Sequence, residues 1–170
     1  MTVFRRCAGD EDYAKASLFI LERRHDLHPA FTTLDIVALL YSYITDGHLF
    51  VAEKDDGGLI AASAYYRGTP ELGYEDKRVA FVDLVVVDRA FRGSRVFMAG
   101  LKSLVDHVSA EYPEIEEMRF AALADNAYVC KLYAKLARFS GIREGAIGQE
   151  MIYSEKIARL GSILGKYDSL

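Results

Sequence analysis

The chain has 170 residues, a length that suits one domain with a single hydrophobic core spanning residues 1–170. With 51% hydrophobic residues, 27% charged residues and 3 prolines, its composition is that of an ordinary globular protein rather than a disordered or Pro-rich one. The net charge of −4 gives no general attraction to phosphate backbones, so we expect no nucleic-acid partner.

The two cysteines and the lengths of the apolar runs bear on metal binding and on the cellular location. Cys7 and Cys130 are too few for a disulfide scaffold, and they lack the spacing of metal ligands, so no metal site is predicted. The first residues contain no apolar signal core, and no apolar run approaches the roughly 18 residues that a membrane span needs. We therefore expect a cytoplasmic protein without a membrane partner.

The N-terminal segment predicts a strand followed by two helices. Residues 1–8 can form a short strand, and the first helix is expected to begin at Asp10 or Asp12 and to run to about His25. Pro29 disfavours helix in the residue before it and therefore separates the first helix from the second.

The second helix and the hairpin after it have clear boundary signals. Thr32 followed by Asp35 resembles a capping box, and Gly47 is a suitable stop. The apolar segments on either side of residues 55–58, Asp-Asp-Gly-Gly, are expected to pair as a hairpin, because Asp-Gly is a strong hairpin turn.

The middle of the chain predicts a buried strand, a helix and a second strand. Residues 79–87 are β-branched and nearly all apolar, as in a central strand buried on both faces. The turn at residues 92–94 leads into a helical pattern that Pro113 closes, and residues 118–124 read as the next strand.

The C-terminal part predicts one more helix and one more strand. Asn126 can cap a helix that Gly141 ends, and residues 149–155 form the expected last strand before a short tail helix. The order β-α-α-β-β-β-α-β-α-β indicates an α/β (α+β) protein with a single mixed sheet.

The first candidate site is the strand, turn and helix start at residues 83–98. A helix N-terminus presents N–H groups without intrahelical partners and a positive dipole end, both suited to a pyrophosphate. Gly93 and Ser94 are small enough for close approach of a ligand, and Arg92 and Arg95 can add charge-assisted hydrogen bonds. The alternative is that this turn is merely a connection.

The second candidate site is the pair Asn126 and Tyr133. Seven residues are two helical turns, so both side chains share one face of the expected helix. Asn126 can bond a ligand and Tyr133 can donate a proton, although the first can equally be a helix cap and the second a core residue.

Together, these two segments resemble the GNAT superfamily of acyl-CoA-dependent N-acetyltransferases. The family pattern Val-Asp-Pro-x-Tyr-Arg-Gly-x-Gly-x-Gly corresponds here to residues 87–97, Val-Asp-Arg-Ala-Phe-Arg-Gly-Ser-Arg-Val-Phe. A second pattern, Asn-x-x-Ala-x-x-Leu-Tyr-x-Lys, corresponds to residues 126–135, Asn-Ala-Tyr-Val-Cys-Lys-Leu-Tyr-Ala-Lys. The resemblance implies a mostly antiparallel sheet flanked by helices on both faces.

The resemblance also implies roles for individual residues. Asn126 would line the cofactor arm, Tyr133 would protonate the departing thiolate, and Asp83 is the candidate base, with burial beside a polar partner as its alternative reading. The backbone positions that would hold acetyl-CoA, the co-substrate, are Val85, Val86 and Val87 for the pantetheine arm and Arg92, Gly93, Ser94, Arg95, Val96, Phe97 and Met98 for the pyrophosphate.

The acceptor is expected to be a primary amine on a small molecule or a peptide, attacking the thioester directly. By resemblance His25 and His28 border its pocket, with solvated loop histidines as the alternative. Tyr65 and Tyr66 are candidates either to line the acceptor cleft or to cover the sheet. A homodimer is compatible with this fold, although the sequence shows no interface.

Arg95-Val96-Phe97 replaces the small residues of the family's cofactor loop, which leaves two alternatives open. One is a non-catalytic module that binds CoA or a metabolite. The other is an acyltransferase that takes its acyl group from an acyl-carrier protein.

Overall fold

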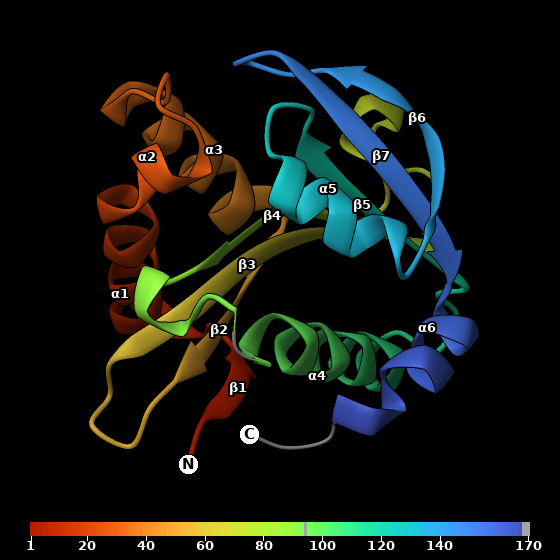
Figure 1. The fold of residues 1–170 in the computed structure, drawn as a ribbon, viewed down its shortest axis with the longest axis horizontal. Coiled ribbons are helices and arrows are strands. Elements are labelled where there is room, and N and C mark those ends of the chain that lie inside the picture. The colour runs from red at the N-terminus through yellow and green to blue at the C-terminus, as the bar shows by residue number, and fades with distance from the viewer. Residues whose placement is uncertain (94, 168–170) are drawn as a thin grey trace.

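Seven strands form one sheet in the order β1-β2-β3-β4-β5-β7-β6, in a computed structural model that describes residues 1–93 and 95–167 (Figure 1). The strands are β1 (Val3–Arg6), β2 (His48–Glu53), β3 (Leu59–Arg67), β4 (Val79–Val87), β5 (Glu117–Leu123), β6 (Arg138–Glu144) and β7 (Gln149–Lys156). Neighbours are antiparallel except β4 and β5, which are parallel. The predicted single mixed, mostly antiparallel sheet is confirmed.

Helices cover both faces of the sheet. They are α1 (Gly9–Glu22), α2 (Arg24–Leu27), α3 (Thr33–Asp46), α4 (Val96–Glu111), α5 (Ala127–Ala134) and α6 (Ile157–Leu164). One apolar cluster joins α1 and α3 to the sheet, and another joins α4, α5 and α6 to the opposite face. In Figure 1, α1 and α3 accordingly lie across the sheet from α4 and α6. Within the described residues, no helix combines the length and apolarity required to cross a membrane.

Several predicted boundaries appear in the structure. Thr32 caps α3 by accepting from the Asp35 N–H at 3.1 Å, and the Asp35 carboxylate accepts from the Thr32 N–H at 2.8 Å, which is the predicted capping box. The hairpin between β2 and β3 turns at Lys54–Gly58, where Lys54 N–H bonds to the Gly58 carbonyl at 2.9 Å.

The region after α5 differs from the prediction. The helix ends at Ala134 rather than near Gly141, and Arg138–Glu144 form β6, the edge strand that the sequence pattern missed. This strand is mostly exposed, so it lacks the apolar alternation that marks a half-buried strand. The apolar residues Leu136 and Ala137 extend the helical pattern, but they are buried in the turn between α5 and β6.

The functional region depends on an irregularity in β4. Opposite β3, Ala64 pairs with Leu84 and the next residue, Tyr65, pairs with Val82, so Asp83 has no direct partner and forms a bulge. Phe81, Leu84 and Val86 pack with α1 and α3. Past the bulge, Val85 and Val87 therefore pack with α4 on the opposite face.

The same point is where β4 and β5 separate. Their parallel pairing runs from Val79–Glu117 to Val82–Phe120 and then stops, although both strands continue. Each strand keeps its other neighbour, since β4 stays paired to β3 and β5 to β7. The sheet therefore opens into a wedge beyond Val82.

Candidate active site

Two adjoining cavities of about 270 and 310 Å³ occupy this wedge. They share four lining residues, which are Leu27, Val85, Asn126 and Val129. The larger cavity extends toward the loop before α4, and the smaller one lies among α3, β4 and the β6–β7 hairpin. A ligand in one cavity would therefore lie next to a ligand in the other.

The free edge of β4 forms one wall of the larger cavity. The Asp88 N–H donates to the Ile60 carbonyl of β3 at 2.8 Å, and Val86 lies opposite Ala62. Because peptide groups alternate along an antiparallel ladder, the N–H and C=O groups of Val85 and Val87 point to the other edge, away from β3. No strand among residues 1–93 and 95–167 pairs with that edge, so these groups can bond an extended polar ligand.

The loop before α4 forms the far end of the larger cavity. Gly93 has φ of +77°, a conformation that favours glycine, and it lines the cavity together with Arg92 and Phe91. Arg92 Nη2 lies 3.7 Å from Asp26 Oδ2, which holds the guanidinium at the rim. The helix dipole of α4 begins directly after this loop, so the region favours negative charge.

The predicted cofactor positions fall into two groups. Those that line the larger cavity are Val85, Val86, Val87, Arg92, Gly93, Phe97 and Asn126. Arg95 does not line this cavity. Its guanidinium lies over the Tyr167 ring, 5.2 Å from the centroid, and its Nη2 donates to the Lys166 carbonyl at 3.3 Å. Val96 and Met98 pack their side chains into the core, and Ser94 lies outside the described residues.

Phe97 belongs to the core as well as to the cavity wall. It is 7% exposed, packs in the same apolar cluster as Leu101 and Leu104, and its ring centroid lies 5.8 Å from that of Tyr133. The bulky residue in place of the family's glycine is thus accommodated by packing inward, as a side chain on the buried face of α4.

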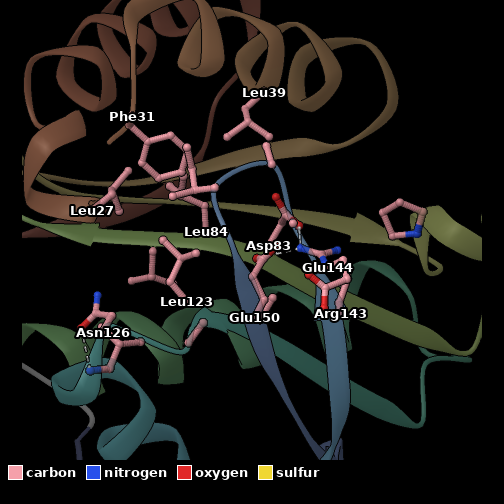
Figure 2. A pocket seen from close by; sticks show the side chains of 18 of the residues that line it. Leu27, Phe31, Leu39, Asp83, Leu84, Leu123, Asn126, Arg143, Glu144 and Glu150 are labelled. Carbon is pink, nitrogen blue, oxygen red and sulfur yellow. Dashed lines mark hydrogen bonds and ion pairs between the residues drawn. The ribbon is translucent and has the colours of Figure 1, made fainter. Parts of the chain in front are cut away.

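Asn126, the N-cap of α5, and Tyr133, within α5, both line the smaller cavity, as side chains on one helical face would. Asn126 caps the helix, since its Oδ1 accepts from the Val129 N–H at 3.2 Å. It lines the smaller cavity (Figure 2) and also the larger one. Tyr133 is 1% exposed and its ring stacks on Phe120 with centroids 4.8 Å apart. Each residue therefore has a structural role and also lines a cavity.

The Tyr133 side chain borders the smaller cavity. No residue among 1–93 and 95–167 forms a hydrogen bond with its hydroxyl. Burial raises the pKa of Tyr133, so the phenol keeps its proton at neutral pH. The protonated phenol can donate a hydrogen bond to a group that gains negative charge in the cavity.

A charged network closes the other end of the smaller cavity (Figure 2). Asp83 Oδ2 accepts from the Tyr43 hydroxyl at 2.5 Å, and its Oδ1 accepts from Arg143 Nη2 at 2.7 Å. The same Nη2 donates to Glu150 Oε1 at 3.0 Å, and Nη1 donates to Glu71 Oε1 at 2.9 Å. Arg143 is therefore the centre of the network, and Asp83 has a partner on each oxygen.

Burial changes the acid–base behaviour of this network. Burial raises the pKa of Glu150, against the opposing effect of Arg143. Burial, together with the negative charge of Asp83, holds the pKa of Tyr43 well above its usual value, so Tyr43 remains a donor. A buried glutamate with a raised pKa is a functional-site candidate because it can accept and release a proton nearer neutral pH.

Sequence reasoning missed Tyr43, Glu71, Arg143 and Glu150. Tyr43 looks like one more member of the apolar stripe of α3, and Arg143 lies on the edge strand that the pattern did not reveal. Of the predicted acceptor-side residues, Tyr66 lines the smaller cavity. Tyr65 is buried on the opposite face, and His28 Nε2 lies 3.2 Å from Asp125 Oδ2 outside the lining.

Residues 17–137 match the family model described as the Acetyltransferase (GNAT) family. The fold is a mixed α/β sheet that opens into a wedge between β4 and β5, and this match covers well over half of the chain. The chain therefore belongs to the GNAT acetyltransferase family. A search of curated proteins found no significant match.

Solved structures with this fold cover nearly the whole chain. A GCN5-related N-acetyltransferase from Kribbella flavida aligns with TM-score 0.65 at 20% identity, over 91% of this chain and 97% of its own. A ribosomal-protein-S18-alanine N-acetyltransferase from Escherichia coli aligns with TM-score 0.67 at 18% identity, over 92% and 94%. An N-acetyltransferase from Staphylococcus aureus Mu50 aligns with TM-score 0.64 at 16% identity, over 92% and 99%. At these identities the likeness shows the fold alone.

Proposed function

We propose that this protein transfers the acetyl group of acetyl-CoA to a primary amine, which attacks the thioester directly. The observation that carries the proposal is the free edge of β4 in the wedge, with Asn126 and Tyr133 on the helix beside it. Family membership supports acyltransferase chemistry in general, and the two adjoining cavities provide one site for each substrate.

The residues of the larger cavity fit acetyl-CoA by the chemistry of their donors. The alternating peptide groups of Val85 and Val87 suit an amide-containing arm, and the loop at Gly93 before α4 suits a pyrophosphate. Arg92 at the rim adds a positive charge. When bound, acetyl-CoA supplies an activated acyl carbonyl and a thiolate leaving group.

The residues of the smaller cavity handle the protons of the transfer. The amine nitrogen forms a bond to the acyl carbon, the carbon–sulfur bond breaks, and one proton leaves nitrogen while sulfur gains another. Tyr133 is the proposed donor to sulfur. Asp83, with Glu150 joined to it through Arg143, is the proposed acceptor of the amine proton.

The test is incubation of the purified protein with acetyl-CoA and a panel of amines, followed by mass spectrometry of the products. An N-acetylated product with stoichiometric release of free CoA is the expected result. Binding of acetyl-CoA without any product would instead favour the non-catalytic module, and absence of binding would favour an acyl-carrier protein as the donor.

A further inference from the structure

The smaller cavity has two chemically different ends (Figure 2). Near α2 and α3 its wall is apolar, made of Leu27, Phe31, Leu39, Leu84 and Leu123. At the other end lie Asp83, Arg143, Glu144 and Glu150. A ligand that fits both ends needs an apolar body and a polar, charged group.

The charges at the polar end are unequal. The lining contains four carboxylates, from Glu71, Asp83, Glu144 and Glu150, and a single cationic side chain, that of Arg143. The side chains of Asp83 and Glu150 are only 10% and 15% exposed, so solvent screens them weakly. The end therefore favours a positively charged group.

Arg143 already donates to three carboxylates, which disfavours it as a receptor for an anion. Its Nη1 donates to Glu71, and its Nη2 donates to both Asp83 and Glu150. Turning it toward a ligand carboxylate would leave the weakly exposed Asp83 and Glu150 without their cationic partner, which is unfavourable. A carboxylate on the ligand would meet uncompensated negative charge.

Two polar groups at the cavity lack a partner of their own. Glu150 uses Oε1 for Arg143, and its Oε2 has no hydrogen bond within residues 1–93 and 95–167. The Tyr133 hydroxyl is likewise unpartnered, on a side chain that is 1% exposed. Both residues line the cavity, so a ligand there can supply the missing partners.

From these four observations we infer that the acceptor is a small amine with one ammonium group on an apolar body and no carboxylate, and that Glu150 binds its ammonium group. That this amine is the acyl acceptor rests on the proposed function. That the cavity prefers such an amine rests on the residues that line it. Amino acids are thereby excluded as free acceptors, because their carboxylate lies next to the amine.

The test is direct binding in the absence of acetyl-CoA, by isothermal titration. The probes are 2-phenylethylamine, phenylalanine, which adds a carboxylate, and phenylalaninamide, which adds a neutral group of similar size. We expect 2-phenylethylamine and phenylalaninamide to bind with similar affinity and phenylalanine to bind at least about tenfold more weakly. The carboxylate of phenylalanine would face the weakly exposed carboxylates of the cavity, and this repulsion costs more than about 1.4 kcal/mol. Equal affinity for phenylalanine and 2-phenylethylamine would overturn the inference.

A pair of variants on one strand tests the role of Glu150. Glu150→Gln keeps the shape and is expected to weaken 2-phenylethylamine binding about tenfold. Glu155→Gln is the matched control, because Glu155 is a buried glutamate on the same strand outside the cavity. Unchanged binding by folded Glu150→Gln would contradict the assignment.

A third variant displaces Glu150 without removing its charge. A Cβ added at Gly145 would collide with Glu150 Oε2, so Gly145→Ala is expected to weaken amine binding as well. The proposed function has a separate readout: if 2-phenylethylamine binds as expected but acetyl-CoA yields no N-acetyl product from it, the transfer reaction fails while the binding inference stands.

Discussion

Asp83 of β4 and Arg143 of β6 form an ion pair, with Oδ1 and Nη2 2.7 Å apart, although two other strands separate β4 from β6 in the sheet. The pair spans the wedge at the point where β4 leaves β5. The side chains are 10% and 16% exposed, and attraction to Asp83 and Glu150 raises the pKa of Arg143 although burial opposes this. The pair therefore ties the two halves of the opened sheet together.

Removal of this cation should destabilise the protein. Arg143→Gln leaves Asp83 and Glu150 facing each other, and we expect a loss on the order of 3 kcal/mol in the free energy of unfolding at pH 7, measured by urea denaturation. Arg78→Gln is the control, because its 2.6 Å pair with Glu116 is largely exposed and should contribute about 0–1 kcal/mol. Equal effects of the two changes would mean that the Asp83–Arg143 pair does not join the sheet halves.

Tyr133 should affect turnover rather than cofactor binding. Tyr133→Phe removes only the hydroxyl, and we expect kcat to fall about 100-fold, within the range of general acid catalysis. The Kd for acetyl-CoA should change less than about twofold, because no interaction of the phenol with the larger cavity is involved.

The matched control for Tyr133 is Tyr65→Phe. Tyr65 is also fully buried and its hydroxyl also lacks a partner within the described residues, but it lies away from both cavities. Its change should leave kcat intact. If Tyr133→Phe lowers kcat and acetyl-CoA affinity in step, or lowers neither, Tyr133 is a structural residue.

Phe97 should be required for stability. Phe97→Ala would leave a cavity against Tyr133 and Leu101, and we expect a loss of about 3 kcal/mol or more in unfolding free energy. Phe139→Ala, at a side chain that is 53% exposed, should change stability by less than about 0.5 kcal/mol. A stable Phe97→Ala variant that binds acetyl-CoA more tightly would show instead that Phe97 obstructs the cofactor cavity.

The corner between β1 and α1 should give a pH-dependent contribution to stability. Arg5 donates two hydrogen bonds to Asp12, at 2.6 and 2.9 Å, and the Ala8 N–H donates a third at 2.9 Å, which together lower the pKa of Asp12 to about 2. Because the folded pKa lies below the ordinary 3.8, this stabilisation is present above the unfolded pKa and is lost as pH falls through the folded one.

Asp12→Asn should therefore lower the melting temperature at pH 7. The difference from wild type should shrink as the pH is lowered from about 4 to about 2, where the wild-type carboxylate takes up its proton. Calorimetry of both proteins across this range measures the effect. A difference that stays constant with pH would mean that the carboxylate charge is not responsible.

The parts of the fold that the sequence revealed are those with strong local signals. The Thr32–Asp35 capping box, the turn at residues 55–58 and the apolar strand at residues 79–87 each specify structure through neighbouring residues. The Asn126–Tyr133 spacing likewise placed two side chains on one helical face, because helical periodicity is a local property.

The parts that sequence reasoning missed depend on contacts between distant segments. Arg143 joins Asp83 and Glu71 over 60 and 72 positions of separation, and nothing near Arg143 in the chain indicates either partner. The bulge at Asp83 depends on how β4 pairs with β3, and the end of the β4–β5 pairing after Val82 depends on β5. Both features therefore depend on segments distant in sequence. The position of Arg95 in the loop predicts a phosphate contact. Its guanidinium instead donates to the carbonyl of Lys166, which is distant in sequence.

The central claim is that the larger cavity binds acetyl-CoA. Isothermal titration of the purified protein with acetyl-CoA tests it most directly. The free edge of β4 and the loop at Gly93 predict binding with a micromolar Kd, and Gly93→Val, which forces a β-branched residue into φ of +77°, should weaken it severalfold. Absence of binding at millimolar acetyl-CoA would contradict the claim that the larger cavity holds this co-substrate.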